Sequence, residues 1–271
     1  MTIIEMQQKV KQLKKIAFEM VIGAGKGHLG GSFSCAEFLV ALYYSGILKF
    51  DSNNPNWEER DYFILSKGHA NNVFYPLLAD LGYFPQSVIT DYNKNGSLLG
   101  GHCEPHIPGV EIVTGSLGHG LGVTAGMALA SKLDGKPNHF YVLVGDGESQ
   151  EGSTWEALMF IAQYKLTNLT VVIDQNGLGS EDYIENTSNL SKLVWRLNTF
   201  GFDAVNCAGN DIDDILLCLK QRSSDLPKAI VLHTIKGKGL VTAENQPKSH
   251  HTLPKGNDVE LCRRSLENEY R

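Results

Sequence analysis

Two glycine-containing segments carry side chains whose chemistry suits a metal ion held against a phosphate. The first is GDGE at 145–148 and the second is DQNG at 174–177, and each follows a short apolar run. Glycine lets the backbone turn sharply and approach a ligand closely. A carboxylate repels phosphate unless a hard cation lies between them, and Mg²⁺ binds few protein oxygens together with phosphate. The candidate ligands for Mg²⁺, or for Ca²⁺, are the Asp146 carboxylate, the Asn176 amide oxygen and the Leu178 carbonyl.

Two predicted strands, 140–144 and 169–173, position these segments, because both runs are apolar and rich in β-forming residues. Between them, residues 148–164 have apolar side chains at helical spacing. A right-handed strand–helix–strand crossover brings both strand ends to the same edge of a parallel sheet. Either segment alone would be an ordinary turn, since Asp-Gly and Asn-Gly are common turn formers. The pair, separated by one helix of crossover length, favours a ligand site.

The same alternation of strand and helix patterns continues along the chain. The further predicted elements are two helices, at 190–200 and 212–219, and two strands, at 202–205 and 229–235. Short apolar strands alternating with helices predict an α/β fold, with a parallel sheet flanked by helices on both faces. No repeat, low-complexity tract or linker interrupts the sequence, so residues 1–271 are expected to form a single domain.

Three Gly/His-rich stretches do not fit this alternation and are predicted to be long loops, at 23–31, 66–70 and 96–120. Long loops inside compact domains are usually functional. They hold histidines that directly follow a glycine: His28, His69, His102 and His119. Zinc is disfavoured, because the chain has no HExxH motif and Pro105 prevents a helical His102–His106 pair. Hydroxyl-rich sugars suit these loops better, because imidazole both donates and accepts protons near neutral pH. His139 and His233 lie elsewhere and are assigned structural roles.

The bulk composition excludes several classes of function. The 271 residues carry a formal charge of -6 and the pI is about 5.8, so no nucleic-acid-binding surface is expected. The five cysteines include no CxxC pair, which is typical of reduced thiols in a cytoplasmic protein. Residues 6–21 are predicted to form a helix with its lysines mostly on the solvent face, and they do not resemble a signal peptide. No stretch approaches the roughly 20 apolar residues of a membrane span, so a cytoplasmic protein without membrane contact is expected.

The span between the two glycine-containing segments resembles the signature of thiamine-diphosphate enzymes. Residues 145–177 read GDGESQEGSTWEALMFIAQYKLTNLTVVIDQNG. Other segments resemble, in the same order, loops of the transketolase family: GHLG at 27–30, LSKGH at 65–69, GH at 101–102 before a proline, TGSLGHG at 114–120 and NQPKSH at 245–250. The resemblance covers about residues 5–255 and implies the diphosphate-binding domain of a transketolase, with thiamine diphosphate and Mg²⁺ as cofactors.

Within this resemblance, individual residues take on roles. The metal would be bound by Asp146, Asn176 and the Leu178 carbonyl. The residues that would contact thiamine diphosphate are His69, Gly115, Ser116, Leu117, Gly147, Asn176 and His250. The catalytic candidates, which would face the sugar hydroxyls, are His28, His102 and His250. Glu151 resembles a glutamate at the interface that links paired active sites. His119 and His251 stand where the family usually has glutamine and a small residue, and they receive no role.

The resemblance also implies a partner. In transketolases, a glutamate of a separate pyrimidine-binding domain activates the cofactor, and arginines outside the first domain bind the sugar phosphate. A second subunit carrying the pyrimidine-binding and C-terminal domains is therefore expected, in an α2β2 heterotetramer. The expected reaction transfers a two-carbon ketol unit from a ketose donor to an aldose acceptor. Two alternatives remain open: a subunit like deoxyxylulose-phosphate synthase or the 2-oxoacid dehydrogenase α chain, and a non-catalytic cofactor-binding remnant.

Overall fold

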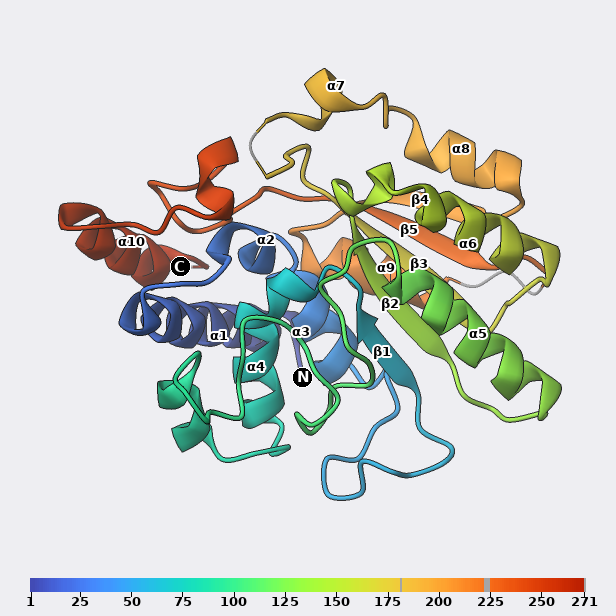
Figure 1. Cartoon of the computed structure of the whole chain (residues 1–271), viewed down its shortest axis with the longest axis horizontal. Coiled ribbons are helices and arrows are strands. Elements are labelled where there is room, and N and C mark those ends of the chain that lie inside the picture. Colours follow the sequence, from blue (N-terminus) through green and yellow to red (C-terminus); the bar gives the residue numbers. More distant parts are fainter. Residues whose placement is uncertain (181, 222–224, 271) are drawn as a thin grey trace.

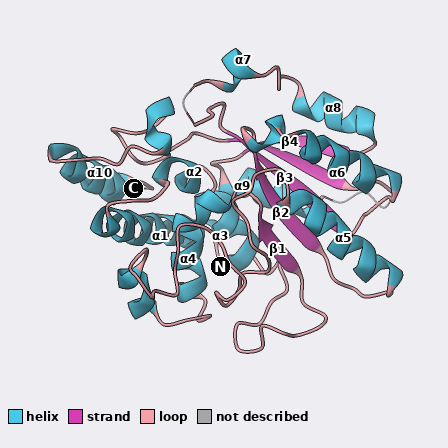
Figure 2. Ribbon diagram, viewed as in Figure 1, coloured by secondary structure: helices cyan, strands magenta, loops and turns pink. Residues whose placement is uncertain are grey.

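The chain folds around one parallel β-sheet, as the alternation of strands and helices predicts. The computed structural model describes residues 1–180, 182–221 and 225–270. The strands are β1 (Tyr62–Leu65), β2 (Phe140–Gly145), β3 (Leu169–Gln175), β4 (Asp203–Ala208) and β5 (Lys228–His233). Their order in the sheet is β1-β2-β3-β5-β4, and each neighbouring pair is parallel. Figure 2 shows the strands as a fan in the middle of the molecule.

Helices cover both faces of the sheet, which confirms the predicted fold class. One face packs against α1 (Ile3–Ala24), α3 (Ala36–Tyr44), α4 (Asn71–Asp80) and α9 (Ile212–Lys220). The other packs against α5 (Gly120–Leu133), α6 (Gly152–Gln163) and α8 (Leu193–Phe200). Successive side chains of β2 alternate between the two faces, since Tyr141 and Leu143 lie in the first core and Val142 and Val144 in the second. In Figure 1, α1 and α4 lie to the left of the sheet, and α5 and α6 lie to its right.

Further helical elements lie outside the two layers, and two of them, Leu29–Phe33 and Gly68–Ala70, overlap stretches predicted as loops. They are α2 (Leu29–Phe33), α7 (Ile184–Thr187), α10 (Asn257–Asn268) and the 3₁₀ turns Gly68–Ala70, Gln86–Asp91, Glu148–Gln150 and Pro247–His250. The predicted helix 148–164 thus begins as a 3₁₀ turn and continues as α6. The strands β2 and β3 run to Gly145 and Gln175, farther than predicted, so that Asp146 and Asn176 each directly follow a strand. Among the described residues, no helix is both long and apolar enough to cross a membrane.

One lysine of α1 departs from the sequence prediction, which placed the lysines mostly in solvent. Lys14 is fully buried, and its ammonium contacts Glu37 at 2.9 Å and Glu269 at 2.8 Å. A buried charge is tolerated only when it is paired, because its desolvation is costly. This ion-pair network joins α1 and α3 to the segment that follows α10.

Replacing Lys14 with alanine is expected to lower the free energy of unfolding by about 3–5 kcal/mol, because two carboxylates lose their buried counter-ion. The matched control is Lys15→Ala, since Lys15 pairs with Glu267 on the exposed surface. That change should cost no more than about 1 kcal/mol. Urea unfolding of the two variants measures the difference, and equal costs would show that the buried network contributes little.

Candidate active site

A pocket of about 280 Å³ lies at the carboxyl ends of β2 and β3. Its lining includes Asp146, Asn176 and Leu178, whose oxygens could ligate a metal. It also includes four basic side chains: Lys67, His69, Lys236 and His250. Ligands of parallel α/β sheets bind at this edge. The structure therefore brings the two glycine-containing segments together with two histidines that the sequence assigned to the cofactor.

The three predicted metal ligands lie on adjacent strand ends. Gly145 pairs with Asp174 in the β2–β3 register, and the Gly177 N–H donates to the Asp146 carboxylate at 2.6 Å. The Asn176 amide oxygen accepts a hydrogen bond from the Leu178 N–H at 3.1 Å. This set of one carboxylate, one amide oxygen and one carbonyl matches the hard oxygen ligands that Mg²⁺ prefers.

The electrostatics of Asp146 also suit a cation. Burial, followed by the neighbouring Asp174 carboxylate, raises the pKa of Asp146 to about 6, although the Gly177 and Gly147 N–H groups oppose the rise. A divalent cation at this carboxylate would offset both the desolvation and the repulsion. The residues present would therefore suit a hard divalent cation such as Mg²⁺.

Two lysines that line the pocket were not predicted as site residues from the sequence. Lys67 and Lys236 are 1% and 2% exposed. The Lys236 ammonium donates to the Leu178 carbonyl at 3.2 Å and also to the Gly179 carbonyl. Burial, followed by repulsion from Lys67, lowers the pKa of Lys236 to about 8. Both lysines follow strand ends at the same edge of the sheet, and that position is the signal that could have identified them.

Asp174 anchors Lys67 beneath the pocket. It is fully buried and accepts hydrogen bonds from Lys67, Thr234 and Ser34, the last at 2.6 Å. Burial works against its charge, but Lys67 and these hydrogen bonds still hold the pKa of Asp174 below its usual range. Asp174 therefore neutralises one of the two pocket lysines and connects β3 with the loops after β1 and β5.

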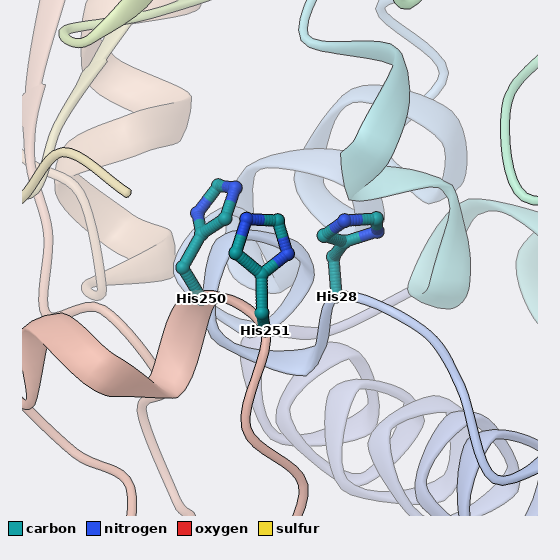
Figure 3. A group of neighbouring side chains, drawn as sticks. All are labelled: His28, His250 and His251. Atoms are coloured by element: carbon teal, nitrogen blue, oxygen red, sulfur yellow. The ribbon is translucent and has the colours of Figure 1, made fainter. Parts of the chain in front are cut away.

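Five histidines gather beside this pocket. The ring centroid of His28 lies 5.6 Å from His69, 6.1 Å from His102, 5.4 Å from His250 and 5.3 Å from His251. His28, His69, His102 and His250 were predicted as site residues, whereas His251 received no role. Figure 3 shows that His28 comes from the loop before α2, and that His250 and His251 come from the end of one helical turn. The loops thus form an imidazole cluster that borders the pocket.

The central histidines of the cluster are neutral near pH 7. Burial, followed by His251 and His102, lowers the pKa of His28 to about 4. Burial, followed by Lys236, lowers the pKa of His250 to about 3. Burial and Lys67 hold the pKa of His69 well below its usual range. Neutral imidazole retains a lone pair, so each ring can accept one hydrogen bond and donate another.

These shifts predict how stability depends on pH. As the pH falls below about 6.5, His28 and His250 become protonated in the unfolded chain but stay neutral in the folded chain. The free energy of unfolding should therefore decrease toward pH 4. The contribution of the neutral His28 and His250 rings to the free energy of unfolding is fully present above pH 6.5 and is lost on acidification. His28→Gln and His250→Gln should each flatten the dependence between pH 7 and pH 5, as measured by urea unfolding of the cofactor-free chain. A slope identical to that of the wild type would contradict the prediction.

The loop before α5 lies against the cluster. Gly115 has a positive φ of 126°, and a Cβ atom there would lie 2.6 Å from the His102 ring, so only glycine fits. Leu117 lines the pocket, whereas Ser116 is exposed and outside its lining. His119 is exposed and its Nδ1 lies 3.0 Å from the Leu117 carbonyl, so it stays outside the imidazole cluster.

The glutamates after β2 differ in position. Glu148, which the sequence analysis left without a role, is buried and accepts hydrogen bonds from the N–H groups of Gly118 and Gly145 at 3.0 and 3.1 Å. It also accepts one from the Ser66 hydroxyl, and so ties three loops of the site together. Glu151 is exposed and lies outside the pocket lining, on the turn that begins α6.

His139, His233 and the five cysteines lie in surroundings typical of structural residues. The His139 Nε2 lies 2.9 Å from the Thr170 hydroxyl, and the His233 Nε2 lies 2.8 Å from the Asn206 amide oxygen. These side chains lie away from the pocket, in keeping with the structural roles predicted for both. All five cysteines are free and buried.

The fold and the pocket together define an α/β domain suited to a metal-bound diphosphate. The family model described as "Transketolase, thiamine diphosphate binding domain" matches residues 5–270. The chain therefore belongs to the transketolase family.

Two relatives match the chain over nearly their full length. The chain is 38% identical to the 6-deoxy-6-sulfo-D-fructose transketolase subunit SqwG of Clostridium sp. (strain MSTE9), covering 92% of this chain and 91% of that protein. It is also 38% identical to an apulose-4-phosphate transketolase subunit from Actinobacillus succinogenes, covering 98% and 97%. The crystal structure of transketolase from Campylobacter jejuni has a TM-score of 0.92 and 28% identity, covering all of this chain and 44% of that one. The chain thus spans less than half of that single-chain transketolase.

Proposed function

We propose that the chain is the diphosphate-binding subunit of a split transketolase, in which it acts as one domain and works with a second subunit. The observation that carries this proposal is the joining of the Asp146, Asn176 and Leu178 oxygens with a five-histidine cluster at one sheet edge. The oxygens suit Mg²⁺ and a diphosphate, and the histidines suit a polyol. A 2-oxoacid substrate has fewer hydroxyls than a sugar and would therefore need fewer imidazole contacts.

The pocket residues fit a bound thiamine diphosphate. Four basic side chains of the pocket would offer N–H donors to phosphate oxygens: Lys67, Lys236, His69 and His250. Asp146 would hold the metal that balances the remaining charge. Gly147 presents the backbone N–H that now donates to the Asp146 carboxylate at 2.8 Å. Gly115, Ser116, Leu117 and Asn176 complete the predicted cofactor contacts. When bound, the cofactor would supply the electron sink for cleaving the bond between carbons 2 and 3 of the ketose.

The histidines of this chain would orient the sugar and move its protons. The Nδ1 atoms of His28 and His250 are buried and have no hydrogen-bond partner in the described part of the chain. A buried polar atom without a partner is costly, so these atoms are suited to sugar hydroxyls. The neutral rings of His28 and His250 can accept a hydroxyl proton as the adjacent carbon–carbon bond breaks and return it to the product. His102 is proposed to contact the same sugar hydroxyls.

A partner subunit is proposed to supply the group that activates the cofactor. Two relatives that match over nearly their full length are named as subunits, which supports such a division. The adjacent helices α5 and α6 leave large apolar side chains exposed: Val123, Met159, Phe160 and Tyr164. Exposed apolar patches mark interaction surfaces. Glu151 lies at the start of α6, and this face would join two such chains in an α2β2 heterotetramer, which we place in the cytoplasm.

Reconstitution tests the proposal. The purified chain with thiamine diphosphate and Mg²⁺ should show no ketol transfer, whereas mixing it with a partner that carries a pyrimidine-binding domain should restore turnover. Donors in the panel should include phosphorylated and sulfonated ketoses, because the relatives are named for both kinds of sugar. Robust turnover by the chain alone, or decarboxylation of a 2-oxoacid in place of ketol transfer, would refute the proposal.

A further inference from the structure

Three members of the imidazole cluster are close enough to share one ion. His28, His250 and His251 each offer a ring nitrogen, and the three nitrogens lie within 4.8 Å of one another. The ring centroids of His250 and His251 are 4.4 Å apart. Figure 3 shows the three rings side by side, from two segments that are distant in the sequence. The absence of an HExxH motif is therefore no obstacle, because the fold assembles the trio from separate loops.

Two of the three rings of the trio have a nitrogen without a hydrogen-bond partner in the described part of the chain. The Nδ1 atoms of His28 and His250 are buried and lack a partner among the described residues. His251 is exposed, so its ring can turn toward the other two.

We propose that His28, His250 and His251 form a binding site for a borderline-soft divalent ion, with Zn²⁺ as the physiological candidate. Zinc binds histidine at about 2.0–2.1 Å in tetrahedral geometry, which places ligand nitrogens about 3.4 Å apart. The three nitrogens, which lie within 4.8 Å of one another, would reach that spacing by rotation of the side chains. Three protein ligands leave the fourth position to water, as in open zinc sites. The oxygen site at Asp146 prefers a hard ion, so the two sites select different metals.

Zinc at this position would compete with the sugar, a consequence that rests on the proposed function. A zinc ion held between the His28 and His250 rings would occupy the space that sugar hydroxyls need to reach these rings. Free zinc would thus inhibit ketol transfer, and a chelator would restore it. His251 makes this device possible, because without it only two of the three ligands remain.

Zinc binding is tested on the full chain without cofactor, partner or oxidised thiols. Calorimetric titration with ZnCl₂ in excess Mg²⁺ should give one zinc per chain. His251→Ala and His28→Ala should each weaken the affinity at least ~10-fold, as loss of metal-site interactions generally does. The matched controls keep the trio intact and should bind zinc as the wild type does: His119→Ala alters an exposed histidine, and Asp146→Ala removes the oxygen site.

The same experiment must distinguish zinc binding at the histidine trio from binding at a second cluster. Cys207, Asp214 and Cys218 also bring ligand atoms within 4.8 Å of one another, on β4 and α9. Titration with Co²⁺ distinguishes the two, since thiolate ligands give an intense near-ultraviolet charge-transfer band and imidazoles do not. Cys218→Ser should leave the affinity unchanged. Zinc binding that is lost in Cys218→Ser, or that survives both histidine substitutions, would overturn the proposal.

Inhibition is tested on the reconstituted enzyme. Zinc should slow ketol transfer by the wild type, EDTA in excess Mg²⁺ should reverse the effect, and His251→Ala should need at least ~10-fold more zinc. Tight binding without inhibition would overturn the competition with sugar. Absence of turnover in zinc-free samples would instead count against the proposed function, because zinc binding to the chain alone is measured independently.

Discussion

Replacing Asp146 with alanine should abolish Mg²⁺-dependent binding of thiamine diphosphate and, with it, turnover of the reconstituted enzyme. The carboxylate is the one charged group among the three proposed metal ligands, and it directly follows β2. Outer-shell changes at metal sites cost 10–100-fold in affinity, so loss of this ligand should cost at least about 100-fold. Calorimetric titration of the purified chain with thiamine diphosphate, with and without Mg²⁺, measures the loss.

The control for this prediction is Asp134→Ala, which removes an exposed carboxylate at the end of α5. It should leave cofactor affinity and turnover unchanged. The Asp146 variant should remain folded, because burial and the Asp174 charge already work against its carboxylate. If the Asp146 variant bound cofactor as tightly as the wild type, the metal would have to lie elsewhere.

Asp174→Ala is expected to lower the free energy of unfolding by about 3–5 kcal/mol. Without Asp174, the buried Lys67 ammonium has no carboxylate among residues 1–180, 182–221 and 225–270 in direct contact, and Ser34 and Thr234 lose an acceptor. The chain should also bind cofactor poorly, because an unanchored Lys67 no longer holds its place in the pocket. Urea unfolding at pH 7 measures the destabilisation.

The double variant Lys67→Met/Asp174→Leu separates charge from packing. Apolar replacement of a buried ion pair is often neutral or stabilising, so the double variant should recover much of the lost stability. Its cofactor affinity should stay low, since Lys67 is gone. Equal instability of the single and double variants would show that the hydrogen bonds of Asp174, rather than its charge, dominate.

Local patterns in the sequence predicted the strands and motifs around Asp146 and Asn176 well. Those strands are short, apolar and followed by turn residues, so their type and approximate position were readable. The strand β1 was missed, because its four residues YFIL are too few to show a period. The resemblance to transketolases singled out the loop histidines, and the fold gathers them, although their roles stay predictions.

The charged interior could not be predicted from the sequence. A lysine in a helical or loop segment is usually solvated, and its burial depends on partners that are distant in the chain. Lys14 meets Glu269 across 255 positions, and Lys67 meets Asp174 across 107. Similarly, a role for His251 can be proposed only because the fold places it beside His28. Such pairings are decided by tertiary structure, and no local pattern reports them.

Lys236 contacts the same carbonyl oxygen that the proposed metal would use. Its ammonium donates to the carbonyl of Leu178, the oxygen proposed to ligate Mg²⁺. Before any metal binds, the positive charge of the lysine therefore stabilises this loop. A metal ion bound to the Leu178 carbonyl would repel the ammonium, which also donates to the Gly179 carbonyl, toward the arriving diphosphate. Loading of the ion and of the anion would then be thermodynamically coupled, with each raising the affinity for the other by the same factor.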